Sequence, residues 1–175
     1  MRRHDGRQPI SNYAFKRTAE LALGSNRPYA PQPLNAALDV MEIYEYDPSY
    51  RTSAVELMAL LQEHERSLCS DRPPSTEVSE AQLDYLVRTC EACEGKIFLA
   101  VMNERAVGVI VVVVDHVHEG TQHVYPKYQK FGLITDFVVA EVYRGTAIAG
   151  ALMGKAEEYC TKLGLSSVRL SVLRA

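Results

Sequence analysis

Alternating apolar and polar residues begin the regular part of the chain, over Met41 to Tyr46. A period of two is typical of a strand with one solvated face, and Asp47-Pro48 ends the pattern. Ser53 and Glu56 then have the spacing of a capping box, and apolar residues recur at helical intervals up to about Cys69. The pattern therefore predicts a strand followed by a helix.

A second helical pattern follows a loop at Ser70 to Ser75, which contains two consecutive prolines. Ser79 and Gln82 are the capping residues that we expect for this helix. Its apolar positions are Leu83, Leu86, Val87 and Cys90. Two helices are thus predicted between the first strand and the next.

β-Branched residues dominate the middle of the chain, at Ile97 to Met102 and Ala106 to Val114. The break between these segments, Asn103-Glu104-Arg105, is typical of a hairpin turn. A polar loop, a strand, a helix and a last strand are then expected at Asp115 to Lys130, Phe131 to Ala140, Gly145 to Leu163 and Ser167 to Leu173. The resulting order, β-α-α-β-β-β-α-β, is that of an α/β protein.

Residues 1–40 differ in character from the rest of the chain. They contain four of the eight prolines and six basic against three acidic side chains, so we expect an N-terminal arm before one domain at residues 41–175. The stretch Phe15 to Leu38 also resembles the translated read-through of recombination sites that flank integron cassettes. On that interpretation, Met41 is the original start of the protein.

Length and composition agree with one globular domain. The 175 residues are 47% apolar and 23% charged, and the net charge of −3 lacks the basic surface that nucleic-acid binding needs. The longest apolar run, Val107 to Val114, is too short to cross a bilayer, and no signal sequence opens the chain, so we expect a cytoplasmic protein. Four cysteines are too few for a disulfide scaffold.

The predicted strand, turn and helix around Arg144 carry the most informative chemistry. Gly145, Thr146 and Ala147 are small, and small residues let an anion approach the unpaired amides and the positive dipole at the start of a helix. Arg144 adds a cation that can contact a phosphate. The alternative is that these small residues only let the helix pack closely on the sheet, and the segment alone does not decide between the two.

Over residues 41–175 the sequence resembles the GNAT superfamily of acyl-CoA-dependent N-acyltransferases. The pyrophosphate motif of that family is Gln or Arg, two residues, Gly, one residue, and then Gly or Ala, and Arg144 and Ala149 match its ends. Asp136-Phe137-Val138-Val139 and Tyr143-Arg144-Gly145 resemble the approach to the motif. Ala147 departs from the motif, because it places a methyl group where the family has glycine.

The resemblance implies acetyl-CoA as co-substrate and a primary amine of a small molecule or peptide as acceptor. It also implies that the main chain of Phe137, Val138 and Val139 binds the pantetheine arm like an added strand. The pyrophosphate would then lie beside Arg144, against Gly145, Thr146, Ala147, Ile148, Ala149 and Gly150.

Members of that family continue into a helix with a proton-donating tyrosine and into further strands. This chain ends at Ala175, so the resemblance implies that the last strands of the family fold are missing, and that either the chain is truncated or another chain completes the sheet. Strand edges left unpaired invite association, and we expect that such an edge can pair in a homodimer.

An acyltransferase needs a base for the attacking amine and hydrogen-bond donors for the oxyanion. Asp136 is the nearest candidate for the base, although a carboxylate at a strand end can also order a loop, and the Val139 amide is a candidate donor. Glu141 is a weaker candidate, better explained as a solvated turn residue. Tyr143 and Tyr159 are better explained by packing, so no general acid is assigned.

Two groups of potential metal ligands have simpler explanations. Cys90 and Cys93 have redox or metal spacing, but a second ligand pair is missing, which favours packing on a helix. A second group near the polar loop consists of Asp115, His116, His118 and His123. Solvated histidines explain this group better, and no metal ion is expected. The same loop supplies candidates for acceptor recognition, namely Gln122, Tyr125 and Tyr128.

Together these features predict a GNAT-like mixed sheet flanked by helices, which transfers an acetyl group to an amine by direct attack in a ternary complex. The alternative is an acyl-CoA-binding module that has lost turnover. The acidic balance of residues 41–175 agrees with a cationic acceptor, but a charge of this size more usually serves solubility.

Overall fold

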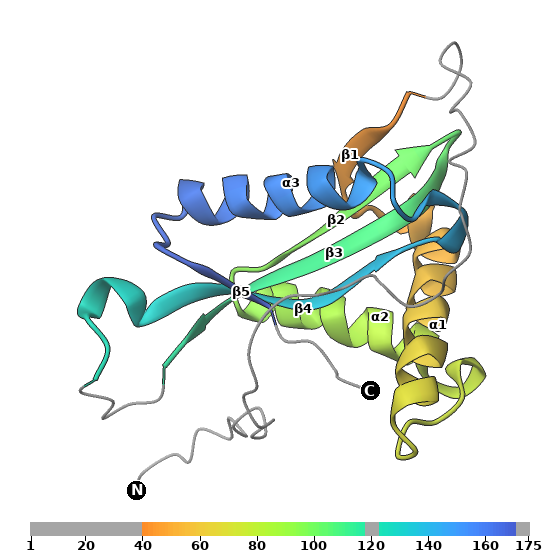
Figure 1. The fold of residues 1–175 in the computed structure, drawn as a ribbon, viewed down its shortest axis with the longest axis horizontal. Helices are drawn as coiled ribbons and strands as arrows, with labels where there is room; N and C mark the ends of the chain where they lie inside the picture. The colour runs from red at the N-terminus through yellow and green to blue at the C-terminus, as the bar shows by residue number, and fades with distance from the viewer. Residues whose placement is uncertain (1–39, 118–122, 171–175) are drawn as a thin grey trace, which may run out of the picture.

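The computed structural model describes residues 40–117 and 123–170 (Figure 1). The predicted arm other than Val40, the integron-like stretch, His118 and Gln122 lie outside the described residues, as does the end of the last predicted strand, residues 171–175. No helix within the described ranges is long and apolar enough to cross a membrane.

One mixed sheet of five strands organises the described residues. The strands lie side by side in chain order and are β1 (Glu42–Glu45), β2 (Lys96–Met102), β3 (Arg105–His116), β4 (Lys130–Val139) and β5 (Val168–Leu170). The first four are antiparallel neighbours, whereas β5 is parallel to β4. The predicted order of elements and the α/β class are confirmed.

Helices cover both faces of this sheet (Figure 1). The helices α1 (Arg51–Leu68) and α2 (Ser75–Ala92) pack on one face, and α3 (Ile148–Lys162) packs on the other. β2 and β3 are therefore buried on both sides, which explains why they are nearly continuous apolar runs rather than alternating ones. Each fully buried Val, Leu or Ile side chain stabilises the fold by roughly 1.5–3 kcal/mol, so the central strands form a firm support for β4.

The predicted start of the first helix at Ser53 is wrong. α1 begins at Arg51, after a short 3-10 turn that Asp47 caps through its bond from the Ser49 amide. Ser53 lies inside the helix, where its hydroxyl donates to the Tyr50 carbonyl and accepts from the Ala106 amide, both at 3.1 Å. The serine therefore serves a long-range bond between α1 and β3 rather than a cap.

The predicted cap of the second helix is wrong for a similar reason. α2 begins at Ser75, and Ser79 donates to the Ser75 carbonyl at 2.7 Å from within the helix. The first amide of α2, that of Ser75, instead donates to the Glu63 carboxylate of α1 at 2.7 Å. A neighbouring helix thus supplies the cap that the local sequence was expected to supply.

Smaller differences occur at the ends of strands. The hairpin turn between β2 and β3 consists of Asn103 and Glu104, with φ values of 48° and 62°, as a two-residue turn with the twist of its strands requires. Arg105, which we expected in the turn, begins β3. β3 continues to His116, two residues into the predicted polar loop, and a 3-10 turn at Pro126–Tyr128 lies within that loop.

Candidate functional site

A β-bulge at Thr135 determines which way Asp136 faces. Val111 of β3 pairs with Asp136 and Val112 pairs with Ile134, so Thr135 has no partner on β3. Side chains alternate between the faces of a strand, and one extra residue exchanges the two faces for everything that follows it. Asp136 therefore points to the face covered by α1 and α2.

The Asp136 carboxyl is buried, with 8% of the residue exposed. Gln82 of α2 donates from Nε2 to its Oδ1 at 3.3 Å. Burial raises the pKa of Asp136, whereas the hydrogen bonds from Thr135 and Gln82 act to lower it. A buried carboxyl with a raised pKa is a better proton acceptor than a solvated one, which is what a general base requires.

The outer edge of β4 is open next to Asp136. The Ala140 amide donates to Val107 of β3 at 2.8 Å, and successive amides of a strand point to opposite sides, so the amides of Phe137 and Val139 point away from β3. On that side, β5 pairs only with residues 132–134 of β4 within the described part of the chain. Phe137 and Val139 thus present main-chain groups that no described strand covers.

A tight turn leads from this edge to α3. A 3-10 turn at Glu141–Tyr143 is followed by Arg144 and then by Gly145, whose φ of 77° is a conformation that favours glycine. The Thr146 hydroxyl donates to the Tyr143 carbonyl at 2.6 Å and accepts from the Ile148 amide at 3.4 Å. The predicted helix start at Gly145 is therefore three residues too early, because α3 begins at Ile148.

Several amides around the start of α3 are free. Those of Gly145, Ala147, Ala149 and Gly150 donate to no acceptor within the described residues, whereas the Thr146 and Ile148 amides make only long bonds of 3.4 Å. A methyl group added at Gly145 or Gly150 would meet no described atom within 4 Å, so the space beside them is open. These amides lie at the positive end of the helix dipole, an arrangement that suits an anion.

The departure from the family motif at Ala147 does not distort the turn. Ala147 caps α3 with φ −68° and ψ −7°, a helical conformation that alanine adopts without strain. Arg144 is exposed, and its Nε donates to the Val139 carbonyl at 3.4 Å. The arginine that we expected beside a phosphate thus contacts the open edge of β4 in this structure.

Glu65, which interacts with the charge of Asp136, and its ion-pair partner Arg72 were not predicted from the sequence. Glu65, near the end of α1, lies 3.6 Å from the Nε of Arg72, with 28% of each side chain exposed. Burial raises the pKa of Glu65, Arg72 lowers it and the charge of Asp136 raises it further. No local pattern marks Glu65, since its place beside Asp136 depends on how α1 packs across β4.

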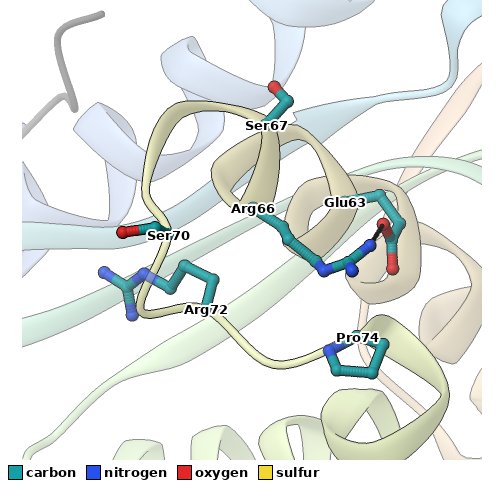
Figure 2. A pocket seen from close by; sticks show the side chains of 6 residues that line it. All are labelled: Glu63, Arg66, Ser67, Ser70, Arg72 and Pro74. Carbon is teal, nitrogen blue, oxygen red and sulfur yellow. Dashed lines mark hydrogen bonds and ion pairs between the residues drawn. The ribbon is translucent and has the colours of Figure 1, made fainter.

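A pocket of about 380 Å³ lies at the connection between α1 and α2 and is lined by Glu63, Arg66, Ser67, Ser70, Arg72 and Pro74 (Figure 2). Figure 2 shows Arg66 turned toward Glu63, with which it forms an ion pair at 3.3 Å, while the Arg72 guanidinium extends toward the side of Ser70. The two guanidinium groups therefore do not converge on one ligand position.

The remaining candidates lie away from this region or pack. Tyr159 of α3 donates from its hydroxyl to the Glu94 carbonyl at 2.9 Å, and its ring packs edge-on against Phe98. Tyr143 packs against the core beneath α3, and Tyr125 is 77% exposed. Tyr128 and Glu141 are exposed as well.

The described cysteine and histidine candidates do not form a ligand group. Cys90 and Cys93 are free thiols, and burial raises the pKa of Cys90 to about 12, which keeps it protonated at neutral pH. Within residues 40–117 and 123–170, no three His, Cys, Asp or Glu side chains come together in a way that could hold a metal ion. His116 and His123 belong to these ranges, and His118 does not.

The sequence matches the model of the acetyltransferase (GNAT) family over residues 45–175. The chain therefore belongs to the GNAT family of acetyltransferases, and the predicted resemblance is confirmed. Among curated proteins, no sequence matches this chain.

Solved structures of similar fold agree with this assignment. A GNAT-family acetyltransferase from Staphylococcus aureus is 19% identical, with a TM-score of 0.57 over 77% of this chain and 75% of that one. An integron cassette protein from the mobile metagenome of Cole Harbour Salt Marsh is 18% identical, with a TM-score of 0.56 over 74% and 76%. AAC(6′)-Iy in complex with the bisubstrate analogue CoA-S-monomethyl-acetylneamine is 13% identical, with a TM-score of 0.54 over 77% and 80%. The expected mixed sheet flanked by helices is thus the GNAT fold.

Proposed function

We propose that the protein transfers an acetyl group from acetyl-CoA to a primary amine of a small molecule or peptide. The observation that carries the proposal is the continuity between the open edge of β4 and the free amides at the start of α3. A ligand with an extended amide-containing arm and a diphosphate at its end matches both parts. Acetyl-CoA has this chemistry, and the solved relative AAC(6′)-Iy is described with a CoA-containing bisubstrate analogue.

In this proposal the pantetheine arm pairs with Phe137, Val138 and Val139 along the outer edge of β4. The pyrophosphate accepts hydrogen bonds from the amides between Gly145 and Gly150. The bound pantetheine arm then displaces Arg144 from the Val139 carbonyl, and the released guanidinium can contact the phosphate.

Asp136 acts as the general base in the same proposal. It takes a proton from the acceptor ammonium group, the resulting amine nitrogen attacks the thioester carbonyl, and the Val139 amide donates to the oxyanion that forms. When the tetrahedral intermediate collapses, the C–S bond breaks and the new C–N bond remains, so the products are the acetylated amine and the CoA thiol. The thiolate takes up the second proton of the attacking nitrogen.

A catalytically impaired acyl-CoA-binding module is the second candidate. Two observations favour it. The methyl group of Ala147 lies where the family motif has glycine, and Arg144 already donates to the Val139 carbonyl that the pantetheine arm would bind. The cytoplasmic location, the homodimer and the integron-cassette origin stay predictions from the sequence.

Calorimetry with acetyl-CoA tests the nucleotide site. We expect binding to the wild type and an affinity about tenfold lower in Arg144→Ala, since a charge-assisted contact is worth roughly 1.5–3 kcal/mol and part of it is spent on releasing Val139. Arg105→Ala, which removes a surface arginine paired with Glu56, is the control and should bind as the wild type does. Absence of binding contradicts both candidates.

Release of CoA thiol over a panel of primary amines separates the two candidates. An active enzyme releases thiol only with an amine present, and Asp136→Asn stops this release while keeping acetyl-CoA affinity. Tight binding without thiol release from any amine supports the binding module instead.

A further inference from the structure

Gln82 is a polar side chain on the side of α2 that faces the sheet. The buried residues of this helix are Ser79, Leu83, Leu86 and Cys90, and Gln82 lies half-buried among them. Burying an amide costs free energy unless it is hydrogen-bonded. Its Nε2 donates to Asp136 Oδ1 at 3.3 Å, which joins α2 to β4 across 54 positions of the sequence.

The elements packed against Asp136 bring different groups close to its carboxyl. From α1, Glu65 carries a like charge, and Arg72 in the following connection pairs with Glu65. From α2, the Cys90 thiol is protonated at neutral pH and Gln82 donates its hydrogen bond. No lysine or arginine of the described residues forms an ion pair with Asp136. Gln82 therefore supplies the stabilisation from across the core that a cation supplies in other buried carboxylates.

We propose that Gln82 is a positioning residue of the acetyl transfer, which holds the Asp136 carboxylate in the orientation that receives the proton of the acceptor amine. The inference rests on the proposed function. The bulge at Thr135 determines the face toward which Asp136 points, and the Thr135 side chain adds a hydrogen bond from the same strand, which leaves the carboxylate some freedom to rotate about its last side-chain bond. A donor fixed on a rigid helix removes this freedom, and Gln82 thereby acts through Asp136 without touching either substrate.

The same bond has an electrostatic consequence that can be measured. A hydrogen bond to the ionised form of a carboxyl lowers its pKa, so losing the Gln82 donor raises the pKa of Asp136 further. Gln82→Met is the suitable variant, because methionine keeps the approximate length and the packing of the side chain and removes the amide that donates to Asp136. Gln62→Met is the matched control, since Gln62, on α1, donates to the Pro73 carbonyl at 2.8 Å rather than to a carboxylate.

Carbon-13 NMR of the full chain tests the inference independently of turnover. We expect the titration midpoint of the Asp136 carboxyl to rise by about one unit in Gln82→Met and to stay in place in Gln62→Met. An unchanged midpoint in Gln82→Met, with the fold intact in the amide spectrum, overturns the inference.

Kinetics then test the positioning role. In Gln82→Met, kcat at neutral pH should fall about tenfold, the acid limb of its pH profile should move upward with Asp136, and the acetyl-CoA dissociation constant should be unchanged. A kcat that falls no more than in Gln62→Met also overturns the inference. Failure of the wild type to bind acetyl-CoA or to acetylate any amine counts against the proposed function instead, and the NMR titration still decides whether Gln82 controls Asp136.

Discussion

Arg144 donates from Nε to the carbonyl oxygen of Val139 at 3.4 Å, and so connects the turn before α3 to the open edge of β4. The Val139 amide and carbonyl lie on the side of β4 that faces away from β3, where the pantetheine arm is proposed to bind. If the proposed function is correct, binding of the pantetheine arm along β4 therefore requires release of Arg144 from Val139.

The methyl group of Ala147 is the first feature of this site that a single substitution tests. Ala147→Gly restores the family motif and removes the group nearest the proposed pyrophosphate. We expect acetyl-CoA to bind more tightly, by a few-fold, and the protein to lose roughly 0.5–1 kcal/mol of stability from the greater backbone freedom of glycine. Calorimetry and urea unfolding measure the two effects, and an unchanged or weaker affinity contradicts the proposed place of the pyrophosphate.

The turn before α3 depends on the backbone conformation of Gly145. Its φ of 77° is unfavourable for alanine, although the space around it is open, so Gly145→Ala should destabilise the protein by about 1 kcal/mol and weaken acetyl-CoA binding. Gly154→Ala is the matched control, since Gly154 lies within α3 with equally open surroundings and should gain up to about 1 kcal/mol. Equal effects of the two variants on the free energy of unfolding would show that the positive φ of Gly145 does not cause the loss of stability.

Local patterns were sufficient to predict most elements of the fold, and long-range contacts explain where they failed. The apolar runs of β2 and β3 identify central strands because helices cover both faces. The serines at 53 and 79 look like caps in the sequence, but Ser53 bonds β3 and α2 is capped by Glu63 of another helix. A capping pattern does not reveal such partners.

The candidate site shows the same contrast between local patterns and long-range contacts. Gly145, Thr146 and Ala147 are consecutive small residues, and they indicate a turn into a helix, although the helix begins only at Ile148. The bulge at Thr135 has no sequence signal that we recognised, yet it decides that Asp136 faces α1 and α2. Gln82, the hydrogen-bond partner of Asp136, was expected only as part of a cap, because the contact between Gln82 and Asp136 joins distant segments of the chain.

Close packing between β4 and α3 can be tested at Gly132. A methyl group added there would collide with the sulfur of Cys160, which is buried on α3. We expect Gly132→Ala to lower the free energy of unfolding by about 1–3 kcal/mol. Combining it with Cys160→Ala should recover part of this loss, so that the double variant is more stable than the sum of the single effects implies. Urea unfolding of the four proteins gives the coupling, and simple additivity would contradict the predicted collision.

Stability as a function of pH tests the buried state of Asp136. Burial raises the pKa of Asp136 in the folded protein, so the native state holds its proton more tightly than the unfolded chain does. The stabilisation from this carboxyl is therefore present below its unfolded pKa of about 4 and is lost as pH rises through the folded pKa. Asp136→Asn should raise the melting temperature at pH 7, and the gain should shrink below about pH 4.

Asp84→Asn is the control for this prediction, and its expected sign is opposite. The hydrogen bond from Arg51 lowers the pKa of the exposed Asp84 carboxyl, so its ionised form stabilises the protein above the unfolded pKa. At pH 7, Asp84→Asn should leave the melting temperature unchanged or lower it slightly, since an exposed pair contributes little. A melting temperature that falls in Asp136→Asn at pH 7 would mean that the ionised carboxylate is well compensated within the fold, which contradicts a raised pKa for this buried carboxyl.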